Sequence, residues 1–227
     1  MMQQKRIAIV TGAARGIGKA IATALARNGA LPVIADLDGV AAGEVKKEII
    51  ACGGEAGAER VDISDVGEVT QLVAKVVEQY GAVDILVNNA GVLSTTLIGE
   101  LTEDEWDRTI GINLKGAVFA SQQVIEHMKL RGWGRIVNIS SMAGRMGGFS
   151  TGCAYSASKA ALIGVTMRLA REVAADGITV NAVAPGPTKT EMVLEFSREE
   201  QEKLEQALIR DIPLVCEKFQ FSDHVFR

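Results

Sequence analysis

Short apolar runs alternate along the chain with longer segments in which apolar residues recur at helical spacing. The runs span residues 7–11, 32–36, 59–62, 85–88, 135–140 and 179–184, and most are continuous stretches of Val, Ile and Ala. Continuous runs of this length are typical of strands that are buried on both faces of a parallel sheet. We therefore predict an α/β fold in which six strands alternate with helices.

The segments between these runs predict helices over 16–28, 39–52, 65–79, 103–130 and 155–175. We expect the fourth helix to be broken near Gly111 or Asn113. Thr102, followed three residues later by Glu105, forms a capping box that marks the start of that helix. Ser64 is the expected cap of the helix before it.

The composition describes a globular chain with a large core of small aliphatic residues. The chain has 227 residues, of which 48% are hydrophobic, and all 24 of its glycines lie at or before Gly186. This composition excludes an intrinsically disordered protein. Because no linker, low-complexity tract or repeat interrupts the pattern, we predict a single domain over 1–227 with its core at 5–190.

Charge and cysteine content exclude several classes of function. The net charge is −4 and no basic run is longer than Lys46-Lys47, so we expect neither a nucleic-acid partner nor a membrane partner. The first apolar segment is ended by glycine too soon for a signal peptide or a membrane span. Three scattered cysteines and two histidines predict neither a disulfide framework nor a metal site. We therefore expect a cytoplasmic protein.

A glycine-rich turn follows the first predicted strand. Gly12, Gly16 and Gly18 are spaced as GxxxGxG and lead directly into a predicted helix. Glycines at such a turn let a pyrophosphate approach the free amides at the helix N-terminus, where the helix dipole favours negative charge. The alternative is that the glycines serve only tight packing of the strand against the helix.

An acidic residue ends the second predicted strand. Asp36 lies 18 residues after Gly18, close to the position whose carboxylate accepts hydrogen bonds from the ribose hydroxyls of a dinucleotide. A carboxylate there repels a 2′-phosphate, so Asp36 favours NAD over NADP. The alternative role, an N-cap of the next helix, fits Asp38 better. Arg15 is able to pair with a 2′-phosphate, so the preference for NAD is not absolute.

A tyrosine and a lysine lie one helical turn apart near the start of the last predicted helix. Tyr155 and Lys159 share one helix face, about 6 Å apart along the axis. Bringing a tyrosine pKa from about 10 to about 7 takes roughly 4 kcal/mol, which a neighbouring ammonium and a nicotinamide cation are able to supply. An exposed helix face explains most such pairs. Here, however, the preceding strand brings Ser140 and Ser141 to the carboxyl edge of the sheet.

Together these motifs resemble the short-chain dehydrogenase/reductase family of the classical type. The resemblance runs from residue 5 to about 214, and its motifs occur in family order: TGxxxGIG at 11–18, Asn88-Asn89-Ala90-Gly91, Asn113, Ser140-Ser141, Tyr155xxxLys159 and Pro185-Gly186. The family implies a Rossmann-type doubly wound parallel sheet. It also implies nicotinamide-dependent interconversion of a hydroxyl and a carbonyl group.

The resemblance implies a role for each catalytic position. Tyr155 would be the general acid–base on the substrate oxygen. Lys159 would lower the pKa of that tyrosine and bond the nicotinamide ribose. Ser141, rather than Ser140, would orient and polarise the substrate carbonyl. Asn113 would hold the water of a proton relay that reaches Lys159.

The cofactor positions follow from the same motifs. Those around the pyrophosphate and the adenine half are Gly12, Arg15, Ile17, Gly18, Asp36, Asp62 and Ile63. Those toward the nicotinamide are Asn89, Ala90, Gly91, Tyr155, Lys159, Pro185, Gly186, Thr188 and Thr190. With Ser64 as the helix cap, we expect Asp62 to be free. Pro187 departs from the family, in which an apolar or aromatic residue usually follows the glycine.

The residues point to a substrate class rather than to one substrate. NAD preference favours oxidation of a secondary alcohol, a polyol or a sugar-like diol. The resemblance to 3-oxoacyl-thioester reductases is nearly as close, but those usually use NADPH, which Asp36 opposes. Segments 92–97, 142–154 and 191–208 should shape the pocket. Within the second of them, Arg145 is either an anion-binding residue or, as we expect, a solvated arginine.

The end of the chain departs from the family pattern. Residues 191–210 predict an amphipathic lid helix. Beyond Leu214 the family continues with a helix and a last strand, whereas residues 215–227 are rich in phenylalanine and lack glycine. We expect the last strand to be missing or replaced, which leaves a non-catalytic dinucleotide-binding protein as an alternative. The family also implies a homo-oligomer, either a tetramer or a dimer.

Overall fold

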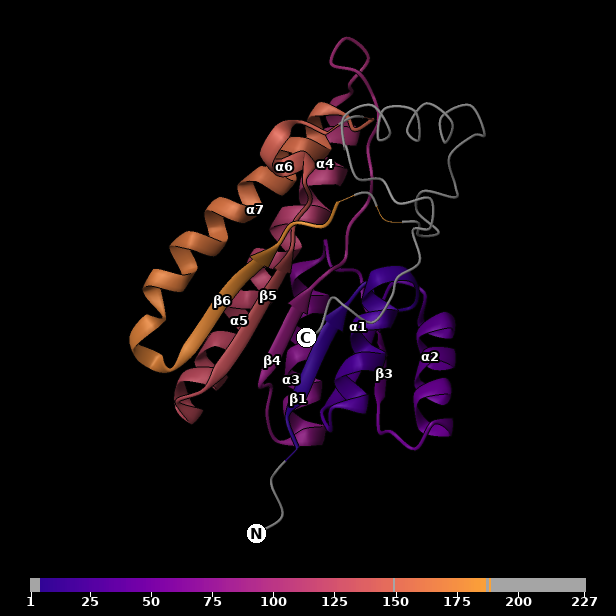
Figure 1. The fold of residues 1–227 in the computed structure, drawn as a ribbon, viewed down its shortest axis with the longest axis vertical. Coiled ribbons are helices and arrows are strands. Elements are labelled where there is room, and N and C mark those ends of the chain that lie inside the picture. Colours follow the sequence, from indigo (N-terminus) through magenta and orange to yellow (C-terminus); the bar gives the residue numbers. More distant parts are fainter. Residues whose placement is uncertain (1–4, 149, 187, 189–227) are drawn as a thin grey trace.

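Six parallel strands form one sheet in the order β3-β2-β1-β4-β5-β6 (Figure 1). The computed structural model describes residues 5–148, 150–186 and 188. The strands are β1 (Ile7–Thr11), β2 (Leu31–Asp36), β3 (Gly57–Arg60), β4 (Ile85–Asn88), β5 (Gly134–Ile139) and β6 (Ile178–Val183). The strand order reverses between β1 and β4, and the carboxyl ends of the strands at such a reversal are where open α/β sheets bind ligands. The predicted Rossmann-type α/β fold is confirmed.

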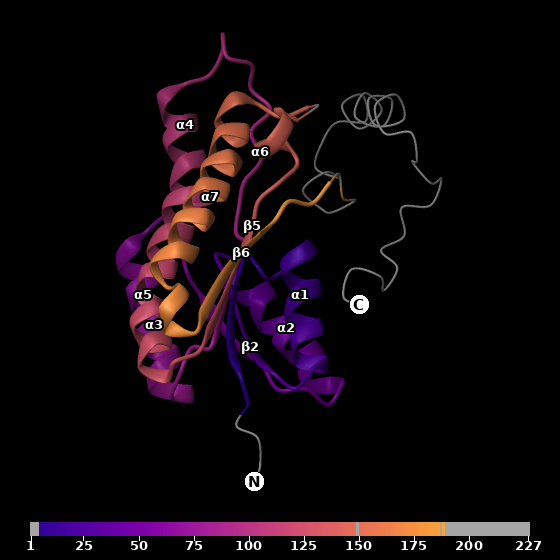
Figure 2. The same ribbon diagram turned by 60° about the vertical axis from the view of Figure 1, so that its left-hand side comes forward.

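Helices cover both faces of the sheet, as the continuous apolar strands require. The helical segments are α1 (Gly16–Arg27), α2 (Gly39–Ala51), α3 (Val66–Tyr80), α4 (Glu103–Ile110), η1 (Gly111–Lys115), α5 (Gly116–Arg131), α6 (Ala143–Met146), α7 (Cys153–Glu172) and η2 (Ala174–Asp176). Helices α1 and α2 lie on one face, and α3, α5 and α7 lie on the other (Figure 2). Each face has its own core of buried aliphatic residues.

Side-chain caps set the start of three helices. Asp38 caps α2, as expected, by accepting hydrogen bonds from the amides of residues 40 and 41. Thr102 caps α4 by accepting from the Glu105 amide at 3.2 Å. The expected cap at Ser64 is wrong, because Asp65 caps α3 instead. A carboxylate one residue later reaches the amides of residues 67 and 68, at 2.7 and 3.0 Å.

Strands β2, β3, β5 and β6 begin one or two residues earlier than the apolar pattern predicts, and two of them, β3 and β5, begin at a glycine. A Cβ on Gly57 would lie 2.6 Å from the Tyr80 hydroxyl, and a Cβ on Gly134 would collide with the Met128 side chain. A helix packs closely over each strand start, and only glycine leaves room for it. Strand β3 also ends earlier than predicted, at Arg60 rather than at residue 62.

The predicted break in the fourth helix is confirmed as a π-helical segment, Gly111–Lys115, between α4 and α5. Such a segment widens the helix by one residue and turns a side chain inward, here the buried Asn113. The single turn α6 was not predicted, and α7 begins at Cys153, two residues earlier than expected.

Several predictions concern residues outside the described part of the chain. They are Pro187, Thr190, the lid helix at 191–210 and the tail at 215–227 with its missing strand. Among the residues that the structure describes, none of the helices is both long enough and apolar enough to span a bilayer.

Candidate active site

The glycine turn after β1 packs directly against the loop after β4. Gly12 has a φ of +62°, and a Cβ on it would lie 2.7 Å from the Ala90 Cα. A Cβ on Gly18 would collide with the Gly12 carbonyl oxygen and lie 2.9 Å from the Ala13 Cα. Tight packing, the alternative role of these glycines, is therefore present, and it brings the turn to the carboxyl ends of β1 and β4.

The start of α1 suits an anion. Its first turn carries no acidic residue, and within the described residues Arg15, at the N-cap, supplies no capping side-chain hydrogen bond. Amides at such an end keep their capacity to bind a phosphate, and the helix dipole assists. Ile17 is half-buried in the same turn of the helix. The turn therefore fits the pyrophosphate of a dinucleotide.

Thr11 and Asn89 join the two loops by hydrogen bonds. The role of Thr11 was not predicted from the sequence. The Thr11 hydroxyl accepts hydrogen bonds from the amides of Asn89 and Ala90 at 3.0 and 3.1 Å. The Asn89 side-chain amide donates to the Thr11 and Gly12 carbonyls at 3.0 and 2.8 Å. Asn89 thus holds the glycine turn in place. The signal in the sequence was the threonine that directly precedes Gly12.

Asp36 lies at the carboxyl end of β2, beside the glycine turn. One carboxylate oxygen accepts a hydrogen bond from the Ala14 amide at 2.9 Å, and the other accepts from the Asp38 amide at 3.1 Å. The side chain is only partly buried. Each carboxylate oxygen has a second lone pair, so the group is able to accept further hydrogen bonds from ribose hydroxyls.

Asp62 and Ile63 follow β3 in the next loop. Asp62 is not free as expected, because it accepts hydrogen bonds from the Ser64 hydroxyl and amide at 2.7 and 2.9 Å. These two bonds are the main reason that the pKa of Asp62 is lowered. Ile63 is buried, and its carbonyl and side chain press on Gly116 at the start of α5. Ile63 therefore anchors this loop to α5.

Ser141, Tyr155 and Lys159 meet at the carboxyl end of β5. Lys159 is 4% exposed and donates a hydrogen bond to the Ile139 carbonyl at 2.8 Å. Its Nζ atom lies 5.8 Å from the centre of the Tyr155 ring. The buried Ser140 hydroxyl donates to the Lys159 carbonyl at 2.8 Å. Ser140 therefore fastens the strand to α7, whereas the side chain of Ser141 is hydrogen-bonded to Tyr155.

Burial dominates the acid–base properties of this group. It raises the pKa of Tyr155, although the hydrogen bond with Ser141 opposes the change. It lowers the pKa of Lys159 to about 8. The expected lowering of the tyrosine pKa is thus not present in the chain alone, since Lys159 points its ammonium at a main-chain carbonyl. At pH 7 most Lys159 side chains still carry a positive charge.

Asn113 ties the π-helical segment to the loop after β4. Its side chain accepts a hydrogen bond from the Val92 amide at 2.8 Å and donates to the Val92 carbonyl and to the Ser158 hydroxyl, at 2.9 and 3.1 Å. A Cβ on Gly91 would lie 3.2 Å from Asn113 Oδ1 and 3.4 Å from Lys159 Nζ. Gly91 therefore lets the two side chains approach the same loop.

Comparison with known proteins assigns this site to a family. Residues 6–201 match the family model described as short chain dehydrogenase. The chain belongs to the short-chain dehydrogenase family. A 3-oxoacyl-[acyl-carrier-protein] reductase of Synechocystis sp. is 43% identical over 196 residues, which cover 86% of this chain and 78% of the relative. A reductase of the same name from Staphylococcus epidermidis is 41% identical over 211 residues, covering 91% and 83%.

A solved structure is also similar to this chain. It is a Sinorhizobium meliloti protein assigned to the short-chain alcohol dehydrogenases, with a TM-score of 0.86 and 37% identity. The match covers 93% of this chain and 82% of that one. This short-chain dehydrogenase is therefore an oxidoreductase of a family that binds a nicotinamide dinucleotide.

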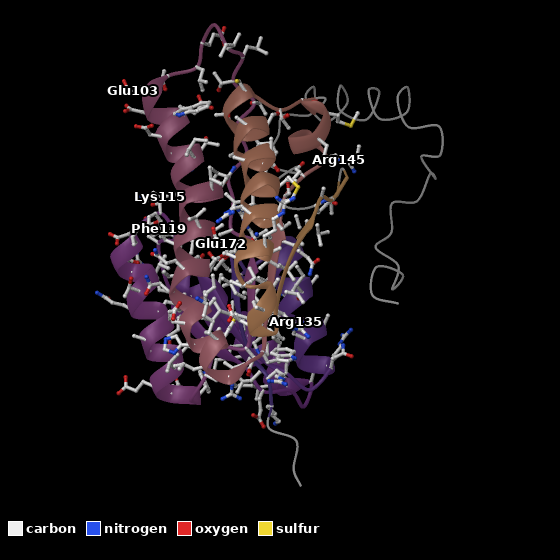
Figure 3. The ribbon with its side chains drawn as sticks, turned by 90° about the vertical axis from the view of Figure 1, so that its left-hand side faces the viewer. Glu103, Lys115, Phe119, Arg135, Arg145 and Glu172 are labelled. Carbon is white, nitrogen blue, oxygen red and sulfur yellow. The ribbon has the colours of Figure 1, made fainter. Side chains whose placement is uncertain are left out.

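In this short-chain dehydrogenase the segment after β6 closes the site beside Ser141. The Pro185 carbonyl accepts a hydrogen bond from the Met142 amide at 3.0 Å, and Gly186 lies against the Met142 sulfur. The Thr188 hydroxyl donates to the Gly186 carbonyl at 3.0 Å. Arg145, by contrast, is exposed on α6, near the upper end of the molecule (Figure 3).

Proposed function

We propose that this short-chain dehydrogenase interconverts a secondary alcohol and a ketone with NAD(H), using Tyr155 as the acid–base group. The observation that supports the proposal is the meeting of Ser141, Tyr155 and Lys159 at the carboxyl end of β5. The glycine turn that fits a pyrophosphate lies on the same edge of the sheet. The bound nicotinamide would accept or deliver the hydride.

The side chains divide the work on the substrate oxygen. In reduction the Tyr155 hydroxyl gives a proton to the developing alkoxide, and in oxidation the Tyr155 phenolate takes the proton from the alcohol. The Ser141 hydroxyl donates to the same oxygen and polarises the carbonyl. Positive charge on Lys159 and on a bound nicotinamide cation would together stabilise the phenolate and offset the effect of burial on the tyrosine. Asn113 holds the Val92 loop against α7 and supports the proton path toward Lys159.

The proposed cofactor is NAD rather than NADP. The Asp36 carboxylate lies next to the glycine turn, within reach of the position proposed for the adenine ribose. It would accept hydrogen bonds from the ribose hydroxyls and repel a 2′-phosphate. We expect Asp36→Ser to lower the ratio of kcat/KM with NAD to that with NADP by about tenfold or more, because charge-assisted hydrogen bonds contribute roughly 1.5–3 kcal/mol.

A second candidate function is reduction of a 3-oxoacyl thioester. It is favoured by the names of the two relatives that are 43% and 41% identical to this chain. Both candidate reactions use the same acid–base group and differ in the substrate and in the preferred cofactor. Asp36 favours the first candidate.

We also propose a homo-oligomer in the cytoplasm. A hollow of about 500 Å³ lies between α5 and α7, lined by Val118, Ile125, Val165 and Leu169. Figure 3 looks onto the side of the molecule that carries α5 and α7, with Phe119 and Glu172 labelled. An apolar hollow between two helices suits the corresponding helices of a second copy. The exposed thiols of Cys52 and Cys153 are unpaired, which suits a reducing compartment.

The test measures the absorbance of the reduced nicotinamide with a panel of substrates. Secondary alcohols, polyols and sugars are tried with NAD and NADP, and ketones and 3-oxoacyl thioesters with the reduced forms. Turnover of an alcohol or ketone with NAD(H) supports the proposal. Tyr155→Phe should keep cofactor affinity and lower kcat by about a hundredfold or more. Binding of NADH without turnover of any member of the panel would overturn the proposal.

A further inference from the structure

A buried chain of side-chain hydrogen bonds joins β4, β5 and α7. Asn88 Nδ2 donates to Asn138 Oδ1 at 2.8 Å, and Asn138 Nδ2 donates to Thr166 Oγ1, also at 2.8 Å. The Thr166 hydroxyl donates in turn to the Leu162 carbonyl at 2.7 Å. Asn88, Asn138 and Thr166 are each at most 5% exposed. We call these three residues the amide chain.

A branch of the amide chain reaches α5. Asn88 Nδ2 also contacts the Ser121 hydroxyl at 3.1 Å and the Ala117 carbonyl at 3.3 Å. The Ser121 hydroxyl donates to the same Ala117 carbonyl at 2.7 Å. The amide chain and its branch therefore connect four elements through side chains in the interior.

Three of these elements, β4, β5 and α7, carry or lead directly into the candidate active site. Asn88 directly precedes the loop that begins at Asn89, and Asn138 on β5 lies three residues before Ser141, which follows the end of that strand. Thr166 lies seven residues after Lys159 on α7, which is two helical turns, so both side chains face the sheet. A shift of α7 along the sheet would therefore break the bond to Asn138 and displace Lys159 and Tyr155 together.

Stability alone does not account for the amide chain. Each bond contributes only about 0.5–1.5 kcal/mol net, and an apolar replacement of both partners is often neutral. Among the described residues, Asn88 Oδ1 has no hydrogen-bond partner, although it is buried. An unsatisfied buried acceptor costs about 1–3 kcal/mol. Apolar packing, however, tolerates a sliding helix, whereas directional bonds between amides and a hydroxyl hold one register.

We propose that Asn138 and Thr166 are positioning residues, which hold α7 at the height on the sheet where Tyr155 meets Ser141. They do not touch the substrate. They act through α7 on the geometry of the acid–base group. The effect on turnover rests on the proposed function, but the effect on Tyr155 does not.

The main variant is Thr166→Val, which removes the hydroxyl and keeps the shape, and its partner is Thr166→Ser, which keeps the hydroxyl. We expect Thr166→Val to lower kcat by about tenfold or more, with KM and the affinity for NADH within about twofold. Thr166→Ser should stay within about threefold of the wild type. The matched control is Thr109→Val on α4, because Thr109 is equally buried and its hydroxyl has no partner among the described residues.

A second measurement needs no substrate. The chain has two tyrosines, Tyr80 and Tyr155, so a protein labelled with ¹³C at tyrosine Cζ gives two resonances, which Tyr155→Phe assigns. Because the bond with Ser141 lowers the pKa of Tyr155, Thr166→Val should raise that pKa by about half a pH unit or more. Tyr80, on α3, should not change. Thr166→Ser should leave both resonances as in the wild type.

The outcomes separate the two proposals. A wild type that turns over nothing, together with a shifted Tyr155 titration in Thr166→Val, removes the proposed function and keeps the positioning role. A Thr166→Val protein with a lower melting temperature but unchanged kcat and Tyr155 titration shows a merely structural hydroxyl and overturns the inference. If Thr166→Val does not fold, Asn138→Leu/Thr166→Val removes donor and acceptor together, and the same two readings apply.

Discussion

Lys159 is the residue whose environment constrains the chemistry most. It is almost fully buried, and its hydrogen-bond partner is a main-chain carbonyl rather than a carboxylate. Burial therefore acts on its charge with little compensation, and its pKa falls to about 8. The same burial raises the pKa of Tyr155. Burial thus disfavours the charged form of both groups.

Replacing Lys159 should change how stability depends on pH. Between about pH 8 and pH 10.5 the folded chain has released the Lys159 proton, whereas the unfolded chain still holds it. The free energy of unfolding therefore gains a term that rises with pH in this window. In Lys159→Met this term is absent. The free energy of unfolding of the wild type minus that of the variant should therefore rise by up to about 3 kcal/mol from pH 8 to 10.5.

Urea unfolding at a series of pH values measures this difference. The exposed Lys47→Met variant on α2 controls for the loss of a positive charge. Parallel curves for wild type and Lys159→Met across the window would mean that Lys159 is not strained by burial.

At the scale of elements, the order of strands and helices could be predicted because apolar runs and glycine turns mark it. The break in the fourth helix could also be predicted, since Gly111 and Asn113 are poor residues for a helix interior. The partner of Asn113 could not, because Val92 approaches it only through the folded loop. In the same way, the sequence predicts Ser64 as the cap of α3, and only the fold shows that the Asp65 carboxylate reaches the amides instead.

The candidate site follows the same division. The motif residues at the strand ends could be predicted, because parallel strands bring their carboxyl ends to one edge. The hydrogen bond from Ser64 to Asp62 and the one from Asn89 to the glycine turn could not be predicted, since both depend on loop geometry. The helical turn α6 was not predicted because it has only four residues, one of them Gly144, and so short a segment carries no periodicity.

Glycine substitutions distinguish a position where close packing requires glycine from a position where it does not. A Cβ on Gly18 would collide with main-chain atoms of the glycine turn, whereas a Cβ on Gly43 in α2 would meet nothing within 4 Å. We expect Gly18→Ala to lower the affinity for NADH by about tenfold or more and to destabilise the protein by roughly 1–3 kcal/mol. Gly43→Ala should stabilise it by roughly 0.5–1 kcal/mol.

Fluorescence titration with NADH and thermal unfolding of both variants provide the measurements. Unchanged affinity in Gly18→Ala would indicate that the turn adapts without loss of the dinucleotide site. A destabilised Gly43→Ala would show that α2 has a packing constraint at this position.

At the scale of the molecule, the two edges of the sheet have different roles. The carboxyl edge carries the candidate site, while the opposite edge is stabilised by ion pairs and cation–π contacts. Buried Asp84 there forms ion pairs with Arg6 and Arg131 at 3.0 and 3.3 Å. The guanidinium groups of Arg6 and Arg135 lie over the Trp133 ring, at 3.8 and 4.3 Å from its centre. Substitutions at this edge should therefore affect stability rather than chemistry.

The face formed by α5 and α7 carries a glycine that the chain itself does not explain. Gly164 lies inside α7 and lines the hollow, and a Cβ on it would meet nothing within 4 Å. Such a glycine costs about 1 kcal/mol relative to alanine in a helix interior. The absence of a side chain at Gly164 would be explained if the backbone of a second copy approached closely there across a two-fold axis. Arg168 and Glu172, paired at 2.6 Å beside the hollow, provide opposite charges that a two-fold copy is able to match.

Placing a charge in this hollow should therefore separate the copies. Val165→Lys puts an ammonium among Val118, Ile125 and Leu169, where a second copy would bury it. A buried unpaired charge costs several kcal/mol, and each 1.4 kcal/mol changes Kd tenfold, so light scattering should report a fall from the wild-type mass to that of a monomer. Val40→Lys, at an exposed valine on α2, should keep the wild-type mass. A monomeric wild type, or a Val165→Lys protein of wild-type mass, would show that this face is not the interface.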